Sequence, residues 1–359
     1  MCFKKKLNNL NKLYIFFFYF VLFININSIS KASANSFKIN DLEISEPFGV
    51  KFNKEKVINR AFKDAFIELI SMITTSSDQK KIKKTSINTI KTLIDSFTMS
   101  DEKFIDDMYI VNFDVNFNKK KTLKFFESKN IFPSIPRKKT VLLMPVFVDM
   151  QSNQISIFND NIFYDNWNLN EERFFLLNYI LPTEDIEDIN LLQENSQSIE
   201  EYNFEKTIEK YDLKDFIIVI IYNNYNDLKI LSKIKINNNL KIDNQTFKKI
   251  NIGDGKSLNE TIIKLKNTYE NHWKDINKIN TSLKLPLNIS IKSAEYDKIL
   301  KFENIMDDLD LVFSYEIAKF DKDTIYYKLI YNGAPNKFLD DLESRGIKIN
   351  IENKNWKIE

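Results

Sequence analysis

The chain has 359 residues, and its 52 lysines and arginines against 50 aspartates and glutamates give a formal net charge of +2 at pH 7. It has one cysteine, one histidine and five glycines. These counts exclude cysteine-ligated zinc, multi-histidine metal sites and glycine-rich phosphate loops, each of which needs several such residues at fixed spacing. At roughly 100–200 residues per domain, the length allows two or three domains.

Residues 1–34 have the pattern of a secretory signal peptide. A lysine-rich start precedes the apolar run LYIFFFYFVLFI at 13–24, and Ala32-Ser33-Ala34 supplies the small-x-small motif of a cleavage site. A membrane-spanning helix needs roughly 20 apolar residues. We therefore expect cleavage after Ala34 and a periplasmic protein. An uncleaved leader that anchors the chain in the membrane is the alternative.

Loss of the leader changes the charge of the chain. It removes Lys4, Lys5, Lys6, Lys12 and Lys31 but no acid, so the formal charge falls from +2 to −3. No excess of positive charge remains to neutralise phosphates, and nucleic acid is not an expected partner. The leader also carries the cysteine, so disulfides and thiol catalysis are excluded for the mature chain.

Residues 37–132 are predicted to form an N-terminal α+β module. A strand is expected at 37–44 and an amphipathic helix at 53–73, where Val57, Ala61, Ala65 and Leu69 recur every fourth residue. A second helix is predicted at 86–97. Strict alternation then predicts a half-buried strand at 109–117, followed by a short helix at 119–129.

The joint FPSIPR at 132–137 separates this module from the next one. Pro133 and Pro136 bias the residues before them to extended backbone, and Arg137 begins a basic run. This pattern predicts a semi-rigid connection between domains rather than an active site.

Residues 138–281 are predicted to form a central α/β domain. The continuous apolar runs that begin at 141 and 216 are typical of strands buried on both faces. Further strands are expected at 228–236 and 246–252. Helices are expected at 170–180, 198–211 and 257–279, and the mixture favours an α/β or α+β fold.

Residues 285–359 are predicted to form a ferredoxin-like domain. The expected order is a strand at 287–293, a helix at 297–308, a hairpin at 311–320 and 324–331, a helix at 336–344, and a last strand at 347–351 that Trp356 and Ile358 could prolong. This βαββαβ order is the split-βαβ plan, which carries little information about function.

Residue types that carry chemistry are scarce or scattered. His272 is the one histidine, and its place on a long helix beside Trp273 favours a packing or surface role. Acidic pairs such as Asp307-Asp308 are adjacent, and adjacent residues on a helix do not face each other. We therefore predict no catalytic, cofactor-binding or metal-binding residues, no cofactor, and no enzymatic activity.

Several stretches of the first 150 residues resemble a known family. The helix RAFKDAFIELI, the strand and helix YIVNFDVNFNKKKTLKFFESKNI, the proline-arginine joint and the strand VLLMPVF resemble the DUF2066 family of exported bacterial proteins of unknown function. Asn118 and the segment Arg60-Ala61-Phe62 match the family pattern only in part. The shared motifs are structural, so the resemblance implies an exported protein and no active-site residues.

The signal peptide, the three small modules and the lack of a catalytic set of residues together predict an exported, soluble, non-catalytic protein. We expect it to bind or scaffold an envelope protein. A periplasmic carboxylate-based hydrolase and a carrier of a small apolar or peptide ligand are the alternatives. Contact with the membrane is expected only through an uncleaved leader.

Overall fold

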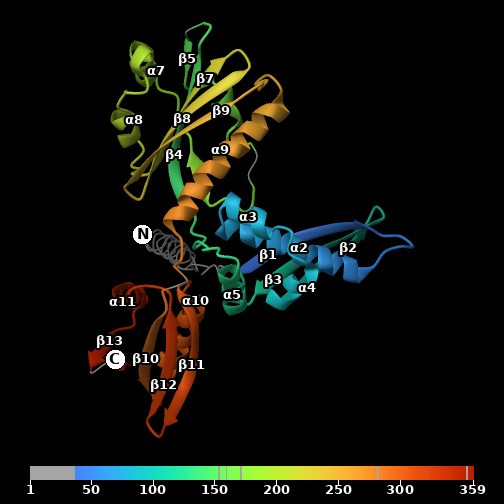
Figure 1. The fold of residues 1–359 in the computed structure, drawn as a ribbon, viewed down its shortest axis with the longest axis vertical. Coiled ribbons are helices and arrows are strands. Elements are labelled where there is room, and N and C mark those ends of the chain that lie inside the picture. Colours follow the sequence, from blue (N-terminus) through green and yellow to red (C-terminus); the bar gives the residue numbers. More distant parts are fainter. Residues whose placement is uncertain (1–36, 153, 159, 170–171, 281–282, 353–354) are drawn as a thin grey trace, which may run out of the picture. The chain divides into compact units, whose positions relative to one another are not determined.

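The computed structural model describes residues 37–359 except 153, 159, 170–171, 281–282 and 353–354. The predicted signal peptide, with Ala32 and Ala34, lies outside these residues. Three sheets flanked by helices make up the described chain (Figure 1). The predicted α+β, multidomain class is thereby confirmed, whereas the predicted domain boundaries stay predictions.

The first sheet is antiparallel, with strand order β1-β3-β2. Its strands are β1 (Lys38–Pro47), β2 (Ile94–Ile105) and β3 (Met108–Phe117). Its helices are α2 (Lys54–Ile73), α3 (Ser76–Ile82), α4 (Ile87–Leu93) and α5 (Lys119–Ser128). Every second residue of β3 is buried, as the alternation predicts, because one face of the sheet lies against the helices.

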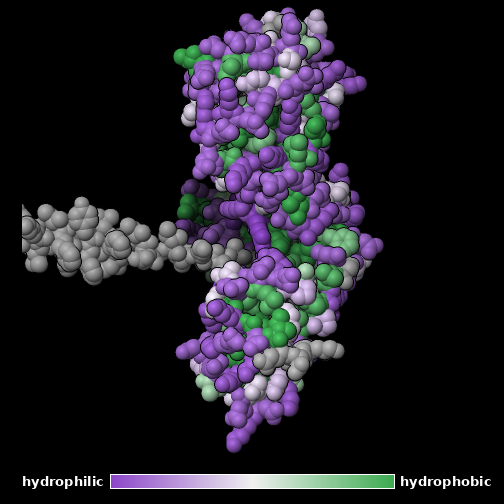
Figure 2. Space-filling model, turned by 90° about the vertical axis from the view of Figure 1, so that its left-hand side faces the viewer, coloured by the Kyte–Doolittle hydropathy of each residue, from purple (hydrophilic) through white to green (hydrophobic). Residues whose placement is uncertain are grey.

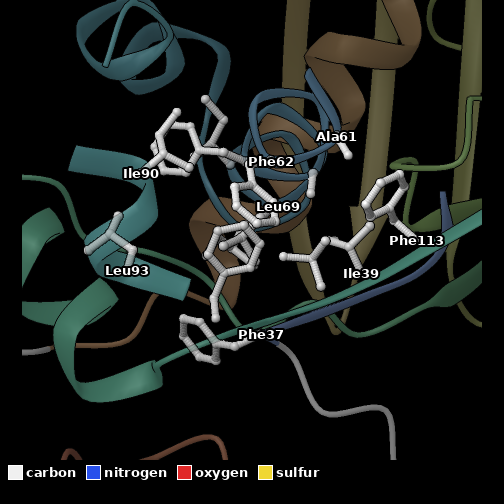
Figure 3. Close-up of a cluster of buried hydrophobic side chains, with 14 of the residues drawn as sticks. Phe37, Ile39, Ala61, Phe62, Leu69, Ile90, Leu93 and Phe113 are labelled. Carbon is white, nitrogen blue, oxygen red and sulfur yellow. The ribbon is translucent and has the colours of Figure 1, made fainter. Parts of the chain in front are cut away.

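The core of this region lies between α2 and the sheet. Figure 3 shows Phe62 and Leu69 of α2 among side chains from α4 and the strands, including Ile39 and Phe113. Ala61 and Leu69 are fully buried, in line with the predicted apolar face of the helix.

One strand of the first sheet was not predicted. The helix expected at 86–97 ends at Leu93, and β2 follows directly. Nearly every residue of β2 is exposed, so its sequence lacks the alternation that reveals a half-buried strand. Backbone pairing with β3 holds it in the sheet, from Ile94 opposite Phe117 to Ile105 opposite Met108.

The second sheet has strand order β5-β4-β7-β8-β9, and β6 also pairs with β4. Its strands are β4 (Lys139–Asp149), β5 (Gln154–Ser156), β6 (Leu177–Ile180), β7 (Phe216–Asn224), β8 (Asp227–Ile236) and β9 (Asn239–Phe247). Its helices are α6 (Ile162–Asn166), α7 (Ile186–Glu194), η1 (Ser196–Ser198), α8 (Glu205–Glu209) and α9 (Gly255–Ile276). The pairs β4–β7 and β4–β6 are parallel, and those of β8 with β7 and β9 are antiparallel.

Helices cover the two faces of this sheet unequally. The long helix α9 lies across one face, and α7 and α8 lie on the other (Figure 1). Val141, Leu143 and Ile217 point into the core beneath α9, whereas Leu142, Met144 and Ile218 point into the core beneath α8. The continuous apolar runs of β4 and β7 are therefore buried on both faces, as predicted.

Three predictions in this region were wrong. The helix predicted at 170–180 is replaced over Leu177–Ile180 by β6, and the helix predicted at 198–211 shrinks to α8, Glu205–Glu209. The strand predicted at 246–252 overlaps the observed strand only at its first two residues, because β9 runs from Asn239 to Phe247. The hydrophobic pattern of a short segment can fit a helix as well as a strand. In this region, contacts with residues distant in the sequence determine which of the two forms.

The third sheet has strand order β11-β12-β10-β14-β13. Its strands are β10 (Leu285–Lys292), β11 (Val312–Asp321), β12 (Thr324–Tyr331), β13 (Ile349–Glu352) and β14 (Asn355–Ile358), and its helices are α10 (Tyr296–Asp308) and α11 (Pro335–Glu343). The single last strand expected from the sequence is a hairpin, and its second strand, β14, pairs in parallel with β10. The ferredoxin-like description stays a prediction.

Helix α11 begins and ends at residues suited to those positions. Pro335 occupies its first turn, where the missing N–H needs no partner. Gly346 follows the helix with φ of +74°, a left-handed conformation that glycine adopts without steric cost.

Candidate functional site

The predicted joint is held by backbone hydrogen bonds on two sides. Pro133 is buried, Pro136 is partly buried and Arg137 is exposed. The amide of Ser134 donates to the carbonyl of Ile73 at the end of α2, at 2.7 Å. On the other side, the carbonyl of Pro133 accepts from the amide of Ile279 at 2.8 Å, just after α9. The joint is therefore an ordered connection.

Both connecting segments of the chain meet at this joint. Ser134 forms an antiparallel bridge with Lys278, which lies on the segment that leads from α9 to the third sheet. The amide of Ile135 also donates to the carbonyl of Asn277 at 3.0 Å. The indole N–H of Trp273 donates to the carbonyl of Arg137 at 2.7 Å. The end of α9 thus contacts the joint through both backbone and side-chain groups.

A row of charged side chains runs along the buried side of α9. Lys266, Glu270 and Lys274 follow one another at four-residue spacing, and their exposed fractions are 2%, 1% and 4%. Glu270 Oε1 accepts from the amides of Leu176 and Leu177 at 2.8 and 2.7 Å, which fixes the start of β6.

The neighbours of Glu270 balance part of its charge. Lys274 Nζ lies 4.0 Å from Glu270 Oε2 and also donates to the carbonyl of Ser71. Burial raises the pKa of Glu270, while the charge of Lys274 and the two backbone hydrogen bonds act in the opposite direction. Burial likewise lowers the pKa of Lys274. Through these contacts, α9 is joined to the start of β6 and to the end of α2.

On the face of the second sheet that α8 covers, part of β8 and all of β9 have no helix over them. In the pairing register, Lys233 of β8 lies between Ile218 of β7 and Ile242 of β9, and Lys235 lies between Phe216 and Leu240. The core beneath α8 extends only as far as Leu231 on β8. We call Lys233, Lys235, Leu240 and Ile242 the β8–β9 face.

The β8–β9 face is apolar at its edge and basic along its middle. Leu240 and Ile242 are 63% and 59% exposed. Lys233 Nζ lies 5.9 Å from the ring centroid of Phe204, and Lys235 Nζ lies 5.6 Å from that of Phe216. A groove of about 410 Å³ next to α8 is lined by Phe204, Phe216, Lys233, Lys235 and Leu240 among others. Figure 2 shows one side of the molecule, on which hydrophobic residues form separate patches in a mainly hydrophilic surface.

Acidic residues of the helices beside the third sheet, including Asp307 of the adjacent pair noted in the sequence, have structural partners. Asp307 accepts from the Tyr315 hydroxyl at 2.9 Å, and Asp341 accepts from the Tyr331 hydroxyl at the same distance. Within the described part of the chain, no group of three or more His, Cys, Asp or Glu side chains is placed to hold a metal ion.

Sequence reasoning missed both the charged row and the β8–β9 face. The i, i+4, i+8 spacing of Lys266, Glu270 and Lys274 is visible in the sequence, but the same spacing is typical of a solvated helix face. The β8–β9 face could not be found because most of β9 was not predicted as a strand.

Comparisons with known proteins found no match to this chain. No protein-family model matches it, and no curated protein sequence does. The resemblance to the DUF2066 family therefore stays a prediction. Over the residues that the structure describes, none of the helices has the length and apolar character required to cross a bilayer.

Proposed function

We propose that the chain is an exported, non-catalytic binding or scaffold component of the cell envelope, and that it engages its partner through the β8–β9 face. The exposure of Leu240 and Ile242 beside the apolar groove is the observation that carries this proposal. Apolar side chains grouped on a surface are typical of a protein interface, whereas single exposed ones need no explanation.

The shape of the site favours a helix as the bound element. An α-helix with its side chains is about 10 Å wide, and neighbouring strands are about 4.8 Å apart, so one helix spans two strands. Helix α9 already covers the other face of β8 and β9. A partner helix on the β8–β9 face would complete a third layer, which is the usual way for a sheet to bury its second face.

The charges of the site favour an acidic partner. Lys233 and Lys235 stand on β8 between the apolar groove and the exposed edge, and Lys229 lies on the same face of that strand. Acidic side chains along the rim of an amphipathic helix would meet these lysines while its apolar side chains contact Leu240 and Ile242. The proposed partner is therefore an envelope protein with an acidic amphipathic helix.

The proposal is tested by site-specific photo-crosslinking in cells. A photoreactive residue at position 242 is expected to form a discrete adduct, and its yield should fall in the double variant Leu240→Ser, Lys235→Gln. Position 317 on β11 provides the matched control, because Ile317 is 55% exposed and also lies on an edge strand. We expect no discrete adduct there.

Identification of the adduct completes the test. Mass spectrometry should locate the crosslink in an acidic amphipathic segment, and purified partner should bind more weakly as the salt concentration rises. Equal adducts at 242 and 317, or an adduct insensitive to the double variant, would contradict the proposed site.

A further inference from the structure

Charge is divided unequally between the first sheet and three of the helices beside it. Residues 38–47 and 94–117, which form the strands of this sheet, contain two lysines and nine acidic residues, a formal charge of −7. Residues 76–93 and 119–129, which hold α3, α4 and α5, contain ten lysines and two acidic residues, a formal charge of +8. The two layers nearly cancel in the net charge of the chain, so its composition does not reveal this division.

The lysines of the helical segments gather where α4 meets α5. The amide of Asn118 donates to the carbonyl of Leu93 at 2.7 Å, which places the end of α4 against the start of α5. Figure 3 shows Ile90 and Leu93 of α4 within the core cluster, and Phe126 of α5 is fully buried. The opposite sides of both helices are therefore left for polar side chains. We call the following exposed residues the lysine surface: Lys83, Lys84, Lys91, Lys120, Lys121 and Lys124.

Most of the lysine surface has no acidic partner. Among the described residues, its one ion pair joins Lys91 Nζ to Glu55 Oε1 at 3.8 Å. The two acidic residues of the helical segments pair with lysines outside this surface, Asp78 with Lys81 at 2.6 Å and Glu127 with Lys284 at 3.2 Å. Five exposed lysines thus carry positive charge that no neighbouring carboxylate neutralises.

Two of these lysines stand where a cation opposes the stability of its helix. Lys120 and Lys121 lie in the first turn of α5, which contains no acidic residue. The N-terminus of a helix carries a partial positive charge, so cations placed there are unfavourable. The stability of α5 therefore does not account for these lysines, whereas an interaction with an anionic surface would.

The composition of the lysine surface favours lipid over protein or nucleic acid. No large apolar side chain is exposed in residues 76–93 and 119–129, all of which the structure describes. Protein interfaces, in contrast, have an apolar core and are depleted in lysine. These segments also contain no arginine, the residue best suited to recognise the phosphates of nucleic acids. Lysines are mobile point charges, which suit a layer of headgroups whose phosphates have no fixed positions.

From these observations we infer that the lysine surface binds the anionic phospholipid surface of a membrane. A group of about four to eight basic residues is typical of binding to acidic phospholipids. The acidic strands form the other layer of the same region, so repulsion of that layer and attraction of the helices favour one orientation. Sequence reasoning predicted membrane contact only through an uncleaved leader, but this contact needs no leader. It is also separate from the β8–β9 face.

Co-sedimentation with lipid vesicles tests the inference. The mature chain, residues 35–359, is used so that the leader cannot contribute to binding. We expect it to sediment with vesicles of phosphatidylglycerol and phosphatidylcholine, but not with vesicles of phosphatidylcholine alone. An increase in sodium chloride from about 0.05 to about 0.5 M should release the bound protein, because salt screens exposed charges.

Two triple variants locate the contact. The combination Lys120→Gln, Lys121→Gln, Lys124→Gln should weaken binding by about a hundredfold, since each lysine near an anionic surface contributes roughly fivefold. Its thermal midpoint should equal or exceed that of the wild type, because two cations leave the first turn of α5. The matched control Lys248→Gln, Lys249→Gln, Lys256→Gln removes the same charge from exposed positions beside the second sheet and should bind as the wild type does.

Three results would overturn the inference. The first is no binding to the anionic vesicles at low salt, and the second is equal weakening by the two triple variants, which would show that no local surface is involved. The third is tighter binding of a DNA duplex than of the vesicles, lost in the α5 triple variant, which would assign the surface to nucleic acid instead.

Discussion

Replacement of Glu270 by alanine is the sharpest test of the charged row on α9. The carboxylate is 1% exposed and accepts from the amides of Leu176 and Leu177 at 2.8 and 2.7 Å. Its other oxygen lies 4.0 Å from the ammonium of Lys274, which is itself 4% exposed. The substitution removes all three interactions and fills none of the space.

The expected loss of stability follows from the groups that the substitution leaves unpaired, which are two backbone amides and the ammonium of Lys274. Each unpaired buried amide is expected to destabilise the fold by about 1–3 kcal/mol. Loss of one partner of a buried ion pair typically lowers the free energy of unfolding by about 3–5 kcal/mol. These effects overlap because they share one carboxylate. We therefore expect Glu270→Ala to lower the free energy of unfolding by about 3–5 kcal/mol.

Urea unfolding followed by tryptophan fluorescence measures this change. Trp167 and Trp273 both belong to the core beneath α9, so their emission reports on the region concerned. Hydrogen exchange adds a local readout, because the amides of Leu176 and Leu177 should lose protection in the variant. Glu260→Ala, an exposed change on the same helix, should stay within about 0.5 kcal/mol of the wild type.

Two further variants separate charge from hydrogen bonding. Glu270→Gln keeps an acceptor for the two amides but leaves Lys274 without its counter-charge, so its loss of stability should be intermediate. Adding Lys274→Met should recover part of that loss, because the uncompensated buried charge is then removed. A Glu270→Ala variant within about 1 kcal/mol of wild type, with the two amides still protected, would refute the reasoning.

Three other predictions concern single residues. Burial, together with the nearby charge of Lys241, lowers the pKa of His272, so the unfolded chain binds a proton more readily than the folded chain. The free energy of unfolding should therefore fall as the pH drops below 6.5. In urea titrations at acid pH, His272→Gln should lessen that fall. Burial lowers the pKa of Lys119 to about 8 from 10.5, so stability should rise between these pH values in the wild type and stay flatter in Lys119→Met. Gly346→Ala places a side chain at φ +74° and should lower the free energy of unfolding by about 1 kcal/mol, and a thermal midpoint equal to the wild type would contradict this.

Long periodic segments could be predicted from the sequence because their burial pattern is local. The helix expected at 53–73 is α2, Lys54–Ile73, and the strand expected at 109–117 is β3, Met108–Phe117. In both segments one face is buried throughout, so the hydrophobic period alone determines the element.

Segments fixed by distant partners could not be predicted. The start of β6 is extended because Glu270, which lies more than 90 residues later in the chain, binds its first amides. The largely exposed strand β2 is held by pairing with β3, and only a few of its side chains, among them Phe97 and Met99, contact the core. The contact between the Lys266 ammonium and the Tyr179 ring has the same origin, since it forms only when α9 packs beside β6.

The bridge between Ser134 and Lys278 has a consequence for the order of assembly. The ribosome makes Ser134 long before Lys278, so the first connecting segment lacks its bridge partner until the residues after α9 have been synthesised. During that interval we expect the peptide bonds around Phe132 to be more accessible to proteases than in the complete chain. Completion of the chain should remove this accessibility, and truncation before residue 278 should preserve it, so truncated chains are expected to be cleaved at this joint first.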